Sequence, residues 1–441
     1  MNKQLWIEEA GKQGFEGFEI YTSTSASREL KWYEGNMEAF TTSRVTGTSL
    51  RGIYNGKMAY LALENNDDSL REALIEKMKE QAKAISSDDV DVLRSPAGAE
   101  PLEACAGFVR PDAETIQKLL KTIEEKLLAY DERIFMINEL QWADESSTRE
   151  IINSCGLDVQ DGTQMQMVIA GVAARENEEI KNAFHVEIVR DPAKLDVDGF
   201  VKKAAEKALS QLNSEVLASG SYDVIIENEA MTSLFASLSS MFSGDLISKG
   251  ISPLRDKINT KVFSDRITII DDPRNPDALM RAAYDDEGCP TSRKVLVDHG
   301  SFVTMLQNSR SAARMQTEST GNGFKSSYAA PVEVTPMNCY IEPSDISFEG
   351  LMEKMGEGLV ITELAGQHAG INGVTTDFSL QCMGYYVKDG KRAQSVSLIT
   401  IAGNFIDMMN RVEAVGSDLD WSYHTIASPS ILFKGCAISG K

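Results

Sequence analysis

The chain has 441 residues, of which 42% are apolar and 25% are charged, as in an ordinary globular protein with room for two or three domains. Its formal net charge of −22 and its pI of about 4.7 oppose binding to nucleic-acid phosphates and to anionic membrane surfaces, because like charges repel. The sequence has no secretory segment at its start, no apolar window of membrane-spanning length and no CxxC pair among six cysteines. We therefore expect a cytoplasmic protein with reduced thiols, no nucleic-acid partner and no membrane contact.

The first half of the chain alternates helical and strand-like segments. Residues 3–13 are expected to be helical and residues 17–62 to form several strands. Asn55-Gly56 predicts a hairpin within them, because both central residues of a type I′ turn need a positive φ. Residues 131–190 alternate in the manner of strands. Apolar residues at helical spacing predict further helices over 68–85, 112–129 and 197–212.

The second half is richer in strands, and we place the domain boundary near residues 213–221. Two hairpins are expected there, around residues 298–301 and around the Asp-Gly turn at 388–391. The fold class predicted is α+β. It comprises an N-terminal domain of mixed helices and strands over 1–215 and a strand-rich C-terminal domain over 216–441 that contains a long core helix.

That core helix is predicted over residues 231–242. Its apolar residues repeat at three- and four-residue spacing and form one continuous face, and serines lie between them. Gly244 is expected to end the helix. The apolar face consists of Met231, Leu234, Phe235, Leu238, Met241 and Phe242.

A search for chemistry begins with the four histidines, His185, His299, His368 and His424. Their closest spacing is 56 residues, and no HExxH is present, so a zinc site with two histidines on one helix is excluded. No P-loop is present either.

Two acidic runs and one glycine-rich run are further candidates. Asp271-Asp272 and the run 285–287 have no EF-hand spacing, so we expect both on the solvated surface. Gly321-Asn322-Gly323 either forms a plain turn or presents backbone N–H groups to a ligand.

A nucleophile hypothesis can be built on the segment 366–382. It holds His368, Asp377, Ser379 and Cys382, but covalent catalysis needs a nucleophile within hydrogen-bond reach of a base, and sequence proximity does not supply that geometry. The glycines of this segment indicate a loop that approaches a ligand or another backbone closely.

Several motifs, in their order and spacing, resemble the TldD/PmbA (TldD/TldE) peptidase family over essentially the whole chain. The motifs are 32–35 with 50–57, 152–156 (INSCG), 295–300 (VLVDHG), 311–314 (SAAR), 321–323 (GNG), 401–405 (IAGNF) and 415–419 (VGSDL).

The resemblance implies two kinds of subunit. The TldD kind carries an HExxxH helix, with a cysteine near the C-terminus that completes a zinc site, and the TldE (PmbA) kind lacks these ligands. In this register the family's two histidines and its glutamate fall on Ala236, Met241 and Ser237, none of which suits zinc catalysis. The cysteine of TldD subunits would fall in 420–426, which contains His424 and no cysteine, whereas Cys436 lies further on.

The chain therefore resembles a TldE/PmbA-type subunit without zinc positions of its own. The resemblance implies a TldD-type partner that holds zinc, in a heterodimer that cleaves small or unfolded peptides; some family members have been described as modulators of DNA gyrase. Gly321, Asn322, Gly323, His368 and Asp377 are the peptide-binding candidates, and no metal or cofactor is expected in this chain.

Two alternatives stay open. One is an autonomous hydrolase that uses Cys382 or Ser379 with His368. The other is a non-catalytic peptide-binding module, as a homodimer.

Overall fold

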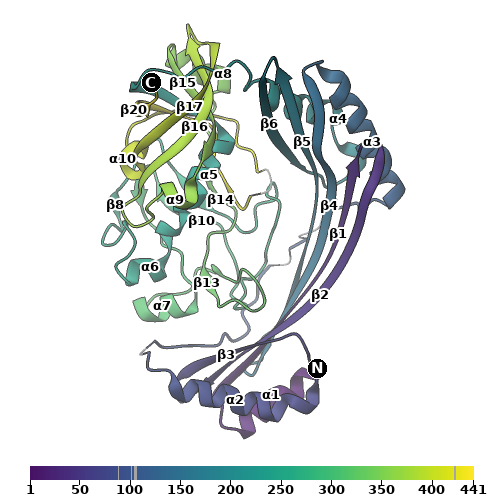
Figure 1. Ribbon diagram of the computed structural model, residues 1–441. Coiled ribbons are helices and arrows are strands. Elements are labelled where there is room, and N and C mark those ends of the chain that lie inside the picture. The colour runs from purple at the N-terminus through teal and green to yellow at the C-terminus, as the bar shows by residue number, and fades with distance from the viewer. Residues whose placement is uncertain (88, 101, 104–106, 422–423) are drawn as a thin grey trace.

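The computed structural model describes residues 1–441 except 88, 101, 104–106 and 422–423. Its first half forms a six-stranded antiparallel sheet in the order β3-β2-β1-β4-β5-β6. This sheet is long and curved, and the C-terminal half of the chain lies on its concave side (Figure 1). The strands are β1 (Gly17–Tyr33), β2 (Asn36–Tyr54), β3 (Lys57–Leu63), β4 (Ile134–Asn153), β5 (Asp158–Glu176) and β6 (Glu179–Ile188).

Four helices pack on this sheet. The helices α1 and α2 pack on one end, while α3 and α4 pack together on the other end (Figure 1). Their bounds are α1 (Lys3–Lys12), α2 (Arg71–Ala84), α3 (Ala113–Tyr130) and α4 (Val197–Leu209), with 3₁₀ turns η1 (Asp68–Leu70) and η2 (Pro192–Lys194). All four were predicted from the sequence to within a few residues.

The helix α3 shows why its sequence pattern predicted a helix correctly. Ile116, Leu120, Ile123 and Leu127 fall on one face and are fully buried, and each such side chain contributes about 1.5–3 kcal/mol on burial. Asp112 caps the helix, since its side chain accepts a hydrogen bond from the backbone N–H of Thr115.

Two predicted hairpin turns are confirmed by their backbone angles. Asn55 and Gly56, between β2 and β3, have φ values of 50° and 71°. Asp389 and Gly390, between β16 (Asp377–Lys388) and β17 (Lys391–Asn404), have φ values of 52° and 70°. The hairpin expected around 298–301 is also present, between β10 (Lys294–Asp298) and a β11 of only two residues (Ser301–Phe302).

The C-terminal half packs two further six-stranded sheets around one core. One has the order β17-β16-β15-β7-β20-β18, and the other has the order β19-β14-β9-β10-β11-β8. The remaining strands are β7 (Gly220–Ile226), β8 (Thr260–Lys261), β9 (Ile269–Asp271), β12 (Gly323–Phe324), β13 (Glu333–Val334), β14 (Cys339–Ile341), β15 (Gly358–Ala365), β18 (Val412–Val415), β19 (Ile426–Ala427) and β20 (Ile431–Ser439). The helices are α5 (Asn228–Leu238), η3 (Ser239–Phe242), α6 (Gly244–Ser248), α7 (Ser309–Met315), α8 (Phe348–Met355), α9 (Gln367–Gly370) and α10 (Phe405–Met409).

The core helix, which was predicted over 231–242, differs from its prediction at both ends, and it begins at Asn228. The α-helix α5 ends at Leu238, and the chain continues as the 3₁₀ segment η3. The hydroxyls of Ser237 and Ser239 donate to the carbonyls of Ser233 and Ala236, and such local bonds compete with the helical pattern. The helix therefore stops before Gly244.

Gly244 begins α6 rather than ending the preceding helix, so its expected role as a stop was wrong. A Cβ atom at Gly244 would lie 2.2 Å from Oε1 of Gln307, so a larger residue here would require that buried side chain to move.

Among the described residues, no helix is long and apolar enough to cross a membrane.

Candidate interdomain binding site

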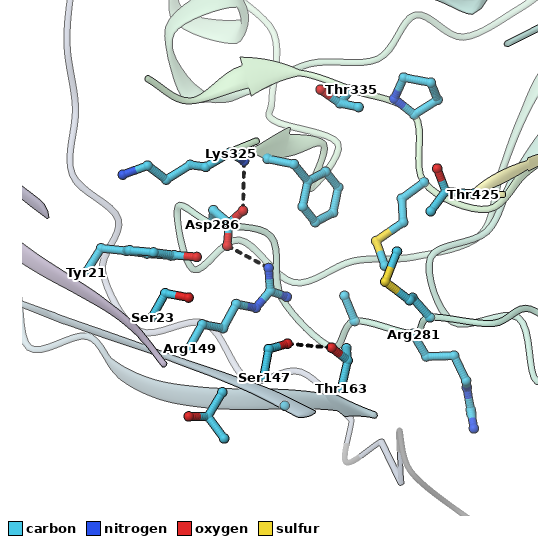
Figure 2. A pocket seen from close by; sticks show the side chains of 17 residues that line it. Tyr21, Ser23, Ser147, Arg149, Thr163, Arg281, Asp286, Lys325, Thr335 and Thr425 are labelled. Carbon is cyan, nitrogen blue, oxygen red and sulfur yellow. Dashed lines mark hydrogen bonds and ion pairs between the residues drawn. The ribbon is translucent and has the colours of Figure 1, made fainter. Parts of the chain in front are cut away.

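A cavity of about 300 Å³ lies between the concave face of the first sheet and the C-terminal half. Strands β1, β4 and β5 form one wall. The other wall consists of the loops that contain residues 280–286 and 335–337, together with the end of β12 and the following Lys325. Figure 2 shows the side chains from both walls pointing toward one another. The two halves of the chain thus build this cavity jointly.

An ion pair joins the two walls of the cavity. Nη1 of Arg149 in β4 lies 2.6 Å from Oδ1 of Asp286, and Oδ2 of Asp286 accepts the backbone N–H of Lys325 at 2.8 Å (Figure 2). Burial alone would lower the pKa of Arg149, but the nearby Asp286 and Asp161 raise it above the ordinary value. Arg149 is therefore a permanent charge that positions the loop of Asp286.

Lys325 contributes an amine to the lining of the cavity. Its Nζ donates to Oγ of Ser49 at 2.6 Å and lies 4.6 Å from the centre of the Tyr21 ring. Burial, and then the positive charge of Arg51, lower the pKa of Lys325 to about 8. Burial and then Asp286 raise the pKa of Tyr21, so the phenol stays protonated. Near neutral pH the ammonium form of Lys325 therefore still predominates, and both it and the phenol of Tyr21 are hydrogen-bond donors.

Behind the cavity, a buried charge cluster also joins the two halves. The guanidinium of Arg51 in β2 pairs with Glu19 in β1 and, at 2.9 Å, with Oε1 of Glu287. The other oxygen of Glu287 accepts the backbone N–H of Ser309 at 2.6 Å. These contacts hold the pKa of Glu287 below its usual value against burial, whereas burial and the charge of Glu287 raise the pKa of Asp285.

This geometry corrects the prediction for the acidic runs. Asp285, Asp286 and Glu287 were expected on the solvated surface, but all three are buried, and so is Asp271. Each finds a cationic or N–H partner inside the protein, which is the condition for burying a carboxylate.

The run Gly321-Asn322-Gly323 lies near the buried acids, and its polar groups are hydrogen-bonded within the protein. The side-chain amide of Asn322, which is 0% exposed, donates to Asp271 at 2.9 Å. The N–H of Gly323 donates to Oδ2 of Asp285 at 2.9 Å. These contacts favour the structural turn over the ligand-binding alternative.

The three positions that correspond to the family's two zinc-binding histidines and its glutamate are on α5 and η3. Ala236 is half-buried against the core, Ser237 is exposed with its hydroxyl on the carbonyl of Ser233, and Met241 is 1% exposed in the core. None offers an imidazole or carboxylate, and α5 ends between the first and last of them. These residues do not fit a zinc ion.

The segment expected to hold the family's cysteine includes residues 422–423, which lie outside the described residues. In the part of the chain that the structure describes, no group of three or more His, Cys, Asp or Glu side chains is arranged to hold a metal ion. Cys436 is buried in β20, and burial raises its pKa to about 11.

The nucleophile hypothesis meets a physical obstacle at Cys382. The thiol is 2% exposed in the core, and burial raises its pKa to about 12. His368 in α9 and Ser379 in β16 are exposed. Cys382 and Ser379 therefore face opposite sides of β16, and a buried, protonated thiol is a poor nucleophile.

Asp377 is exposed at the start of β16, where its carboxylate accepts hydrogen bonds from Thr375 at 2.7 Å and Asn404 at 2.9 Å. His368 and Asp377 do not line the interdomain cavity. Their peptide-binding role remains a prediction.

The sequence did not indicate the residues that build the cavity. Tyr21, Arg149, Asp286 and Lys325 come from four separate segments, and no motif connects them. The only signal was the run of acids at 285–287, which a composition argument assigns to the surface.

Together, the fold and the cavity define a mixed α+β protein in which a long curved sheet packs against a strand-rich C-terminal half. Three models of one protein family match this chain. They are described as PmbA/TldA metallopeptidase domain 1, central domain and C-terminal domain, and they match residues 18–86, 108–212 and 219–440. The chain belongs to the PmbA/TldD metallopeptidase family.

Individual relatives agree with this assignment. Metalloprotease PmbA of Escherichia coli O157:H7 is 28% identical over 363 residues, which is 81% of this chain and 74% of that protein. A Thermotoga maritima structure described as a modulator of a DNA gyrase has a TM-score of 0.89 and 27% identity, and covers 99% of both chains. TldE from Thermococcus kodakarensis, at 23% identity, shares the fold with a TM-score of 0.90 over 99% of this chain and 100% of that one.

Proposed function

We propose that this chain is the TldE/PmbA-type subunit of a two-subunit metallopeptidase, and that it does not bind zinc itself. A TldD-type partner would supply the zinc ion and cleave small or unfolded peptides, while this chain would close the chamber and hold part of the peptide. Family membership supports the peptidase role at the level of the family. The subunit role rests on the residues at the zinc positions.

The observation that carries the proposal is Met241. A zinc ligand must direct a lone pair into an open site, but this side chain packs into the apolar core with 1% of its surface exposed. Ala236 and Ser237 cannot take the roles of histidine and of a glutamate general base. The scaffold therefore retains the fold of the family without its metal chemistry.

The interdomain cavity supports a peptide-holding role. It combines apolar surfaces from Met280, Phe324 and Met337 with the charged groups of Arg149 and Lys325. Mixed linings of this kind are typical of sites that orient a ligand through a few polar contacts.

The test combines metal analysis with a cleavage assay on the same samples. The purified chain, a TldD-type partner and their mixture are each analysed for zinc and incubated with an unstructured peptide. We expect zinc in the partner and the mixture, only traces in this chain alone, and cleavage that is greatest in the mixture.

Stoichiometric zinc in the isolated chain that is lost on His368→Ala or His424→Ala would contradict the proposal. Peptide binding with no cleavage in the mixture would instead favour a non-catalytic binding module, which could be a homodimer. Cys382→Ala is the matched control for the hydrolase alternative, and we expect it to leave cleavage unchanged.

A further inference from the structure

We propose that a second interdomain cavity binds an alkylammonium group, either a lysine side chain or the free amino terminus of a peptide. The inference names a substrate class and so rests on the proposed peptide-binding role. It concerns a different place from the Arg149–Asp286 cavity and involves none of its residues.

The second cavity has a volume of about 420 Å³. It lies where the edge strand β6 and the helix α4 meet the start of α5 and two C-terminal loops. Figure 1 shows β6 as the strand of the first sheet nearest the upper part of the C-terminal half. The lining residues used below are His185, Glu187, Glu229, Asp277, Asp420 and Trp421.

His185 is the first sign of a ligand. It is 6% exposed, and neither ring nitrogen has a hydrogen-bond partner in the structure. Phe200 of α4 packs against the ring with centroids 5.1 Å apart, and Nε2 lies 3.6 Å from Oε2 of Glu187, beyond hydrogen-bond distance. A buried polar group without a partner destabilises the folded protein, so a ligand that hydrogen-bonds this imidazole would offset that cost.

The charged side chains that line the cavity indicate the charge that a ligand should carry. Four carboxylates line the cavity, from Glu187, Glu229, Asp277 and Asp420, against the two cations of Arg190 and Lys203.

Both cations are already engaged. The guanidinium of Arg190 donates to the carbonyls of Pro276 and Ala278 at 3.0 and 3.1 Å. Nζ of Lys203 lies 4.0 Å from Oε2 of Glu187.

Arg190 keeps its charge in these bonds to neutral carbonyls, and Glu229 is itself paired with Nζ of Lys207 at 2.5 Å. The excess negative charge of the lining therefore comes from Asp277 and Asp420, and it favours a cationic ligand.

The shape of the ligand follows from the aromatic wall. Trp421 lines the cavity and is held by an edge-to-face contact with Tyr340, with ring centroids 5.5 Å apart. An indole face attracts an ammonium group and packs against an alkyl chain, and a neutral imidazole accepts a hydrogen bond from the ammonium. A divalent metal ion fits less well, because the described acids and histidine do not form a metal-binding group.

The experiment measures peptide binding to the full chain alone by calorimetry. The probes are acetyl-Gly-Lys-Gly-amide, its norleucine analogue, and the norleucine peptide with a free amino terminus. We expect the lysine peptide or the free amino terminus to bind at least about tenfold more tightly than the acetylated norleucine peptide. The two cationic probes distinguish the side-chain source from the terminal source.

Variants locate the site. The double variant Asp277→Asn with Asp420→Asn removes two exposed charges of the lining and should reduce the preference for the cationic probe to near unity. Asp389→Asn removes an exposed charge in the β16–β17 turn, outside the cavity, and should leave the preference unchanged. The ring resonances of His185, identified with His185→Phe, should shift on binding in the unmodified chain.

Equal affinity for lysine and norleucine probes, or equal losses in the Asp389→Asn control and the double variant, would overturn the inference. The outcome is separable from the proposed function. Cleavage in the two-subunit mixture without a cationic preference refutes only this inference, whereas a cationic preference without reconstituted cleavage refutes only the peptidase role.

Discussion

The substitution Arg51→Met tests whether the buried charge cluster joins the two halves of the molecule. Arg51 is 5% exposed and faces Glu19 and Glu287, which are 0% and 3% exposed. Methionine leaves both carboxylates buried without their cation. Glu19 retains a hydrogen bond from Asn153 at 3.2 Å and Glu287 retains the N–H of Ser309 at 2.6 Å, so part of the loss is offset.

Breaking a buried ion pair by removing one partner typically costs about 3–5 kcal/mol, and we expect a loss of that size in the free energy of unfolding. Urea denaturation followed by tryptophan fluorescence and by circular dichroism measures it, and agreement of the two signals tests whether the halves unfold together.

Two variants serve as controls. Arg255→Met removes an exposed ion pair with Asp256 and should cost less than about 1 kcal/mol. The triple variant Glu19→Gln, Arg51→Met, Glu287→Gln removes the whole cluster and should recover most of the loss. A loss in Arg51→Met no larger than in Arg255→Met would refute the reasoning.

Three further predictions follow from the buried titratable groups. Because the pKa of Lys325 is lowered to about 8, the unfolded chain binds more protons than the folded chain between pH 8 and 10.5. The free energy of unfolding, compared with that of Lys325→Met, should therefore rise by about 3 kcal/mol across that window. Denaturation at each pH measures it. The pH dependence expected for Glu227 has the opposite sign. Burial and then the charge of Glu229 raise its pKa to about 7. The free energy of unfolding, compared with that of Glu227→Gln, should therefore be highest below pH 4.5 and fall by about 3 kcal/mol between pH 4.5 and pH 7. Iodoacetamide should label the exposed Cys155 in the native protein but not the buried Cys382, as read by mass spectrometry.

Each of these has a clear contrary result. A stability difference that does not change with pH would show that Lys325 or Glu227 titrates normally in the folded protein. Rapid native labelling of Cys382 would show an accessible thiol and reopen the hydrolase alternative.

The local pattern of the sequence determined much of the secondary structure. The helix α3 and the Asn55-Gly56 turn were predicted because their causes lie within a few residues: a repeating apolar face, a capping aspartate and residues that adopt positive φ. The sequence also excludes a zinc motif with two histidines on one helix, since its closest histidines are 56 residues apart. The break after Leu238 was missed because serine hydroxyls bond to the backbone there.

Only the tertiary structure decided where the charges lie. Asp286 and Glu287 look like surface residues in sequence, because their partners Arg149 and Arg51 are 137 and 236 positions away. A carboxylate is buried only when such partners converge on it, and convergence depends on how the long sheet curves over the C-terminal half. The unpartnered imidazole of His185 and the lowered pKa of Lys325 have the same origin, since both depend on enclosure by segments distant in the chain.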